Sequence, residues 1–220
     1  MDELLLLGAH EARVLGVLIE KSLTTPDQYP LSLNAVTAGC NQKSNRDPVL
    51  ALGESEVRSA LEKLFVRHYA GHVHPAGGRV EKYRHNAAER LGCGTPQIAI
   101  LAELLMRGPQ TQGELRTRAS RMHPFGSLAE LDDALAPMIE RGLVARHSPA
   151  PGSRAERYLQ LVSPDLHALE APAAVAAAAH APPAPSPGLA GRVDALETEV
   201  ATLRRRFARL AEQLGEPLGN

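Results

Sequence analysis

Tryptophan is absent from this 220-residue sequence, and aromatic residues make up only 3% of it. The hydrophobic cores must therefore consist of leucine, valine, isoleucine and alanine, for which a hydrophobic content of 44% is sufficient. The only two cysteines, Cys40 and Cys93, are too few for a disulfide framework or a cysteine-based metal site. This scarcity fits a reducing cytosol, so we expect a cytoplasmic protein.

Long apolar runs and a large net charge are also missing. The four leucines at 4–7 follow two acidic residues and are too few for a signal peptide, and no stretch approaches the ~18 apolar residues of a membrane span. We therefore expect no membrane association. Because the net charge is only −1, phosphate binding would require a local basic patch rather than a basic chain.

Motifs that carry enzymatic chemistry are missing as well. The sequence contains no G-x-S-x-G, P-loop, Rossmann or H-E-x-x-H pattern. His68, His72 and His74 could supply three zinc ligands, but no acidic or cysteine residue nearby completes a site, and we favour surface histidines. Cys40 lies on the apolar face of a predicted helix and is interpreted as a core residue. We predict that the protein is not an enzyme and holds no cofactor or metal.

What the sequence does contain is an internal repeat. Residues 56–69 (EVRSALEKLFVRHY) match residues 130–143 (ELDDALAPMIERGL) at an offset of 74, with apolar residues at helical spacing in both. A second match, G-x-R-x-E-[K/R]-Y, relates residues 77–83 to residues 152–158. Each copy of this motif follows a short apolar segment and a Pro/Gly turn, which predicts a β-hairpin after each helix.

Two further helices are predicted before each of these segments. They cover residues 11–21 and 32–42 in the first repeat, and residues 96–108 and 111–120 in the second. Each repeat therefore has the order helix, helix, helix, strand, turn, strand. This order is typical of a winged helix, a relative of the helix-turn-helix.

We predict a mainly α protein with small β-hairpins (α+β), made of two winged-helix domains in tandem plus a C-terminal coiled-coil helix. The predicted boundaries are residues 1–90 and 91–170 for the two domains, 171–188 for an Ala/Pro-rich linker and 189–215 for the coiled coil.

The predicted coiled coil rests on an unbroken heptad seam in which apolar residues alternate steps of four and three. The seam consists of Leu189, Val193, Leu196, Val200, Leu203, Phe207, Leu210 and Leu214. Valine at the a positions and leucine at the d positions favours a parallel homodimer. The alternative is an amphipathic helix that folds back on its own domain.

The sequence strongly resembles the YceH family of bacterial proteins. The similarity covers about residues 8–162 and is carried by residues 11–50 (EARVLGVLIEKSLTTPDQYPLSLNAVTAGCNQKSNRDPVL), 77–85 (GGRVEKYRH) and 107–122 (RGPQTQGELRTRASRM). The resemblance implies a pair of winged-helix domains. It implies no particular activity and no catalytic residues.

Features that occur in only one repeat are the better candidates for function. The first repeat has about twelve extra residues, divided between 24–30 and 41–48. Its polar second segment would lie beside the surface that DNA-binding winged helices present to a duplex. The candidate DNA contacts are Lys43, Asn45 and Arg46 in this loop, Arg58 on the third helix, and Arg79, Lys82 and Arg84 on the hairpin. The alternative is a self-satisfied loop in which Asp47 pairs with Arg46.

Charges shared by both repeats are interpreted as architecture. Arg67 and Arg141 recur at matching places, as do Glu81 and Glu156, and we expect a helix-to-hairpin ion pair in each repeat. The outward face of the third helix is mixed in the first repeat but acidic in the second, where it would repel phosphate. The acidic residues there are Glu130, Asp132, Asp133 and Glu140.

Two functions remain open at this point. The first is a dimeric DNA-binding or transcription-regulatory protein that contacts duplex DNA through its first domain. The second is a protein-interaction adaptor or scaffold without direct DNA binding, with the acidic second domain as the surface for a protein partner.

Overall fold

The computed structural model describes residues 6–73, 80–147 and 155–167. The chain divides into two compact units, Met1–Pro172 and Ala173–Asn220, and all described residues belong to the first. The predicted linker and the predicted coiled coil lie outside the described residues. Among the residues that are described, no helix is long and apolar enough to cross a bilayer.

The first half of the described unit contains the elements of the first repeat. They are α1 (Ala9–Thr24), the 3-10 turn η1 (Pro26–Gln28), β1 (Leu31–Ser32), α2 (Leu33–Cys40), α3 (Glu54–Val66), β2 (Ala70–Val73) and β3 (Lys82–His85). A short helix, α4 (Ala87–Leu91), leads to the second half. Gly92 then ends α4 with φ 56°, a left-handed conformation that glycine adopts without steric cost.

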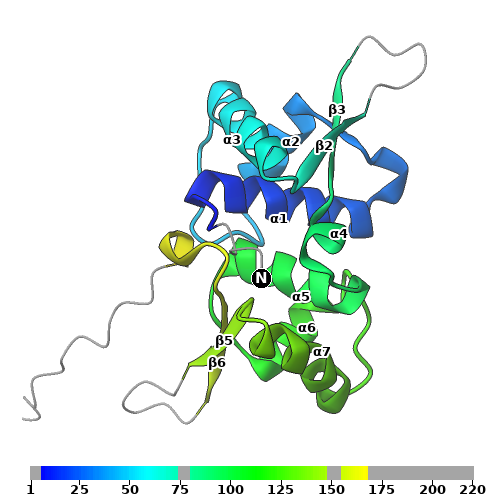
Figure 1. The fold of residues 1–220 in the computed structure, drawn as a ribbon, viewed down its shortest axis with the longest axis vertical. Helices are drawn as coiled ribbons and strands as arrows, with labels where there is room; N and C mark the ends of the chain where they lie inside the picture. Colours follow the sequence, from blue (N-terminus) through cyan, green and yellow to red (C-terminus); the bar gives the residue numbers. More distant parts are fainter. Residues whose placement is uncertain (1–5, 74–79, 148–154, 168–220) are drawn as a thin grey trace, which may run out of the picture. The chain divides into compact units, whose positions relative to one another are not determined.

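The second half repeats the order of the first, without a counterpart of η1. Its elements are α5 (Thr95–Arg107), β4 (Gln110–Thr111), α6 (Gln112–Ala119), α7 (Leu128–Glu140), β5 (Val144–His147), β6 (Arg157–Gln160) and the 3-10 turn η2 (Pro164–His167). Figure 1 shows the two halves with α1 and α5 between them. The predicted α+β class is confirmed, since helices carry small antiparallel sheets in both halves.

Each sheet has three strands rather than the two of the predicted hairpin. The strand orders are β1-β3-β2 and β4-β6-β5, and the equivalent tyrosines sit at the centre of each. Tyr83 lies opposite Leu31 and His72, and Tyr158 lies opposite Gln110 and Arg146. The two-residue strands β1 and β4 are too short to show the alternation by which a strand is recognised in a sequence.

The two halves share one hydrophobic core, built around α1 and α5. Every residue of α1 from Glu11 to Glu20 is buried, and so is every residue of α5 from Ile98 to Met106. Gly16 permits the close approach of the two helices, because a Cβ there would lie 3.0 Å from Cγ of Met106. The core is largely aliphatic, with a few aromatic residues such as Tyr69 and Phe125, and runs continuously from one half to the other.

Candidate functional site

The loop after α2, which was predicted to contact DNA, turns inward at Arg46. The Arg46 side chain is fully buried, and its Nη2 donates to Oε2 of Glu20 at 2.6 Å. Its Nε donates to the carbonyl of Gly39 at 3.0 Å. Both expectations for this residue were wrong: a buried guanidinium held by Glu20 is not free to bind phosphate, and its ion-pair partner is Glu20 rather than Asp47.

Glu20 belongs to a buried ionic network that joins the halves. Arg121, in the loop after α6, donates to Glu20 and, at 3.0 Å, to Glu103 of α5. Arg107 lies 3.1 Å from the same Glu103. Burial alone would raise the pKa of Glu20, but the hydrogen bonds and charges of Arg46 and Arg121 hold that pKa below its ordinary value. Glu20 therefore interacts with both arginines as a carboxylate.

Other bonds attach the same loop to the second half. Arg107 donates to Oδ1 of Asn45, and the amide of Asp47 donates to the carbonyl of Met106 at 2.7 Å. Asn45 has φ 59°, a left-handed conformation that asparagine tolerates better than most residues. Within the loop, Asn45 and Arg46 are thus engaged in the protein, whereas Lys43 is exposed.

A buried arginine of α1 donates hydrogen bonds to the backbone of this loop and of α2. Arg13 donates to the carbonyl of Pro48 at 2.7 Å and to that of Cys40 at 3.4 Å. Burial lowers the pKa of Arg13, and the neighbouring charge of Arg46 acts in the same direction. Cys40 itself is a core residue, and burial raises the pKa of its thiol to about 12, which makes it a poor nucleophile.

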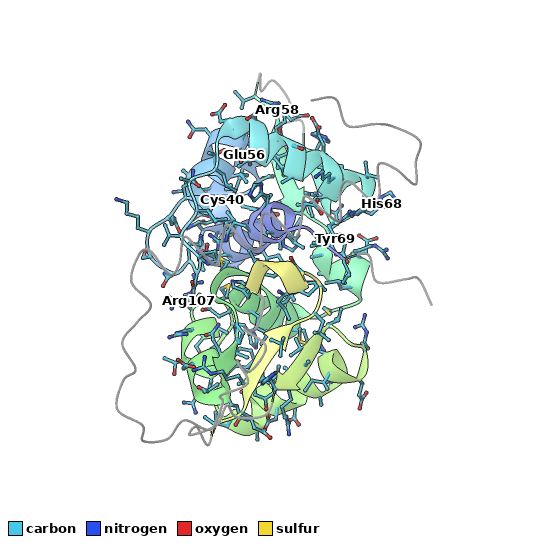
Figure 2. All side chains as sticks on the ribbon, turned by 90° about the vertical axis from the view of Figure 1, so that its left-hand side faces the viewer. Cys40, Glu56, Arg58, His68, Tyr69 and Arg107 are labelled. Atoms are coloured by element: carbon cyan, nitrogen blue, oxygen red, sulfur yellow. The ribbon has the colours of Figure 1, made fainter. Side chains whose placement is uncertain are left out.

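Arg58, the candidate DNA contact on the third helix, lies on the outward face of α3 and is exposed. Arg58 projects from α3, and Figure 2 shows it at the far end of the first half from Arg107. On either side of Arg58 the exposed face mixes hydroxyl, acidic and basic groups, namely Glu54, Ser55, Glu56, Ser59, Glu62 and Lys63.

The hairpin candidates lie on a different face. Successive side chains of a strand point to opposite faces, so Lys82 and Arg84 face away from Tyr83. The Tyr83 ring packs against Phe65 of α3, with ring centroids 6.0 Å apart. The structure therefore places Lys82 and Arg84 on the side of the sheet remote from Arg58. Arg79 lies outside the described residues.

The expected helix-to-hairpin ion pairs are not the ones that form. Arg67 binds Glu11 at the start of α1, with Nη1 and Oε2 2.5 Å apart, and Arg141 donates to the carbonyls of Leu91 and Gly92. Both arginines thus tie the end of the third helix to a neighbouring segment rather than to the hairpin. Their recurrence signals a repeated structural position, but the partner differs between repeats.

Two of the three histidines near the hairpin, His68 and His72, lie within the described residues. His68 is exposed with φ 62°, His74 lies outside the described residues, and His72 stacks on Phe65 and binds Glu81. Within the described ranges, no cluster of three or more His, Cys, Asp or Glu residues could hold a metal ion.

A cleft of about 480 Å³ lies between the start of α1 and the flank of α3. Its carboxylates are already bound, since Glu11 holds Arg67 and Glu56 accepts the amide of Gly53 at 2.8 Å. The lining residues are Gly8, Ala9, His10, Glu11, Ser55, Glu56, Ser59, Ala60 and Lys63.

Comparison with known sequences defines the class of this protein. Residues 7–153 match the model of the family described as "Protein of unknown function, DUF480", and the chain belongs to that family. It is 46% identical to a UPF0502 protein of Enterobacter sp. (strain 638), an alignment that covers 96% of this chain and 98% of the relative. It is 51% identical to one from Geobacter sulfurreducens, over 90% of each chain.

The predicted resemblance to the YceH family is confirmed. The UPF0502 protein YceH of Salmonella paratyphi B is 43% identical over 96% of this chain and 98% of its own length. Because these alignments span nearly the whole chain, they extend beyond the residues 8–162 on which the resemblance was recognised.

Proposed function

We propose that each half is a winged helix and that the first half binds duplex nucleic acid through the outward face of α3. The order α1, β1, α2, α3, β2, β3 with the sheet β1-β3-β2 supports the winged-helix assignment, and the second half repeats it. In such domains the third helix enters the major groove and the hairpin contacts the adjacent backbone.

The observation that carries the proposal is the charge on the two third helices. α3 presents Arg58 and Lys63 beside the hydroxyls of Ser55 and Ser59, groups that bind phosphate or base edges. The equivalent helix α7 contains no lysine or arginine and exposes four acidic residues. Of the two third helices, only α3 could therefore lie against the phosphate backbone without strong electrostatic repulsion.

Lys43 and Arg58 are the contacts to test first. Both are exposed, and neither has an ion-pair partner within the part of the chain that the structure describes. The acidic residues beside Arg58 will oppose binding, so we expect moderate affinity and strong dependence on ionic strength. Lys82 and Arg84 can contribute only if the duplex also reaches the outer face of the hairpin.

The test is the affinity for a mixed-sequence duplex measured over a salt series. The double variant Lys43→Ala/Arg58→Ala should bind more weakly and reduce the slope of log affinity against log salt by about 2, roughly 1 for each lost phosphate contact. The matched control is Arg116→Ala/Arg146→Ala in the second half, which removes the same charge and should leave the slope unchanged. Absence of binding by the wild type at low salt, or an equal effect of the control, would overturn the proposal.

Dimerisation is part of the same proposal. The heptad seam of residues 189–215 would bring two first halves together, so that a dimer can contact two half-sites. Sedimentation of the full chain should give the mass of a dimer, and a chain ending at residue 188 should give that of a monomer. If the full chain and the shortened chain have the same oligomeric state, the coiled coil is not the element that forms the dimer.

An adaptor role is the second candidate, and the acidic face of α7 favours it. A surface bearing Glu130, Asp132, Asp133 and Glu140 suits a basic protein segment better than a duplex. Capture from a nuclease-treated lysate should then yield a stoichiometric protein that Asp132→Lys/Asp133→Lys no longer retains. Recovery of nucleic acid alone would count against this role.

A further inference from the structure

The buried ionic network repeats the same device in both halves. In each, an arginine from the loop after the second helix reaches back to a buried glutamate on the first helix. The pairs are Arg46 with Glu20 and Arg121 with Glu103. Glu20 and Glu103 are almost completely inaccessible to solvent, at 2% and 0% exposure. Two buried carboxylates require such partners, because a buried charge without a partner is strongly destabilising.

Arg121 does more than its counterpart, because it also binds Glu20 of the other half. It therefore shares a carboxylate with Arg46, whose Nε donates to the carbonyl of Gly39 in α2 and whose Nη2 donates to Gln42 within the loop of residues 41–50. Arg107 holds the neighbouring Asn45. The loop that carries Lys43 is thus bonded directly to Arg107 of the second half and, through Arg46 and Glu20, indirectly to Arg121.

We infer that Arg121 is a positioning residue: with Arg107 it fixes the 41–50 loop, so that the second half sets the orientation of Lys43 in the first. The consequence for duplex binding rests on the proposed function, whereas the positioning of the loop does not. Arg121 itself does not contact phosphate in this arrangement, because its guanidinium is occupied by Glu20 and Glu103. The second half then acts as a rigid support for the contact surface of the first.

The loop's own amides report its position without any ligand. The amide of Asp47 bonds to Met106 across the halves, and that of Leu52 bonds to Oδ1 of Asn41 within the first half. In the full-length Arg121→Ala variant we expect faster hydrogen exchange at Asp47 and its neighbours, with exchange in β5 and β6 unchanged. Arg121→Lys, which restores the charge, should recover part of the protection.

Duplex binding supplies the second measurement. Arg121→Ala should lower the affinity roughly 3- to 30-fold, the range typical of residues that act through others. The slope of the salt dependence should equal that of the wild type, because no phosphate contact is lost. Arg116→Ala, an arginine of α6 outside the network, is the control for both measurements and should resemble the wild type.

The outcomes separate the two ideas. If the wild type binds no duplex but the exchange at Asp47 rises as expected, the proposed function fails and the positioning stands. Unchanged exchange at Asp47 in a folded Arg121→Ala overturns the positioning, as does a salt slope reduced by about 1, which would make Arg121 a phosphate contact. Should Arg121→Ala fail to fold, Asn45→Gly keeps the left-handed conformation, removes the bond to Arg107, and must raise exchange at Asp47 for the inference to survive.

Discussion

The two halves of this molecule share their elements and their strand register but differ in how the second and third helices are connected. Residues 41–53 join α2 to α3, whereas the shorter segment 120–127 joins α6 to α7. The longer connection sends Arg46 into the core, and Asn45 and Asp47 to the second half. Asn45 and Asp47 of the longer connection thus hold the two repeats together, so a segment found in only one repeat is not in itself a sign of ligand binding.

The halves also differ in the charge of their third helices. The exposed face of α3 carries charges of both signs, whereas the charged groups of α7 are all acidic. Since the buried faces of the two helices are alike, this difference is not required by the fold. It is the feature on which the proposed division of labour rests, with the first half for contact and the second for support.

The largest effect is expected from removing the centre of the network. Glu20→Ala leaves Arg46 buried without a carboxylate partner, and we expect the free energy of unfolding to fall by about 3 to 5 kcal/mol. Urea denaturation measures this loss. The control is Glu156→Ala, which breaks the exposed Arg146–Glu156 pair in the second half and should cost about 1 kcal/mol or less. Similar losses for both variants would mean that the network contributes no more than a surface pair.

Replacing a glycine by alanine should lower the stability on one of the second helices and raise it on the other. A Cβ on Gly39 of α2 would lie 2.6 Å from Cγ1 of the buried, β-branched Val17, so Gly39→Ala should cost about 1 to 3 kcal/mol. A Cβ on Gly113 of α6 would meet nothing within 4 Å, so Gly113→Ala should gain about 0.4 to 1 kcal/mol. Thermal melts of the two variants check the signs. A gain for Gly39→Ala would show that α2 packs on α1 less tightly than the structure has it.

The pH dependence of stability distinguishes the two sheets. His85 occupies the position opposite Ala70 that Gln160 occupies opposite Val144. Burial and the charge of Arg84 lower the pKa of His85 to about 4. The unfolded chain, with a histidine pKa near 6.5, therefore takes up the proton first, and stability present above that pH is lost as the pH falls toward 4.

The slope between these values should reach about 1 kcal/mol per pH unit. His85→Gln, which introduces the residue of the second half, should flatten it, as measured by urea denaturation between pH 7 and 4.5. Part of the slope should persist, because burial also lowers the pKa of His167. A slope unaffected by the substitution would mean that His85 is not protonated differently in the folded and unfolded states.

The elements of the fold could be predicted wherever burial imposes a periodic pattern of apolar residues on the sequence. The opening helix was predicted over residues 11–21 and extends over Ala9–Thr24, because its apolar positions recur with helical spacing. The strand β1 was missed, since two residues carry no period, and it exists because the edge of β3 offers unpaired backbone groups to Leu31.

The candidate site could be predicted from the sequence less well than the fold. A polar loop gives no indication of which charges it buries, and the partner of Arg46 lies 26 residues away on another helix. One signal was available: Glu20 and Glu103 each lie within an apolar helix, where a carboxylate needs a cationic partner. The single arginine in each loop that follows a second helix, Arg46 and Arg121, could then have indicated an internal network. The exposed groups Lys43 and Arg58 were predictable as surface residues, since nothing in their surroundings requires burial.

The smallest effect concerns the start of the second helices. Thr111 caps α6, and Glu114 completes a capping box by accepting the amide of Thr111 at 3.0 Å. This hydrogen bond lowers the pKa of Glu114. Ser32 caps α2 in the same way, but the exposed Ala35 stands where the glutamate would be.

Introducing the missing group should therefore strengthen the first half. Ala35→Glu is expected to raise the free energy of unfolding by about 0.3 to 1 kcal/mol. The gain should be complete above the ordinary glutamate pKa near 4.3 and should vanish as the pH falls through the lowered pKa of the folded state. The control Ala38→Glu adds the same charge near the other end of α2, where the helix dipole opposes it, and should give no gain. If both variants stabilise equally in urea denaturation at pH 7, the gain comes from net charge and the capping box is not its cause.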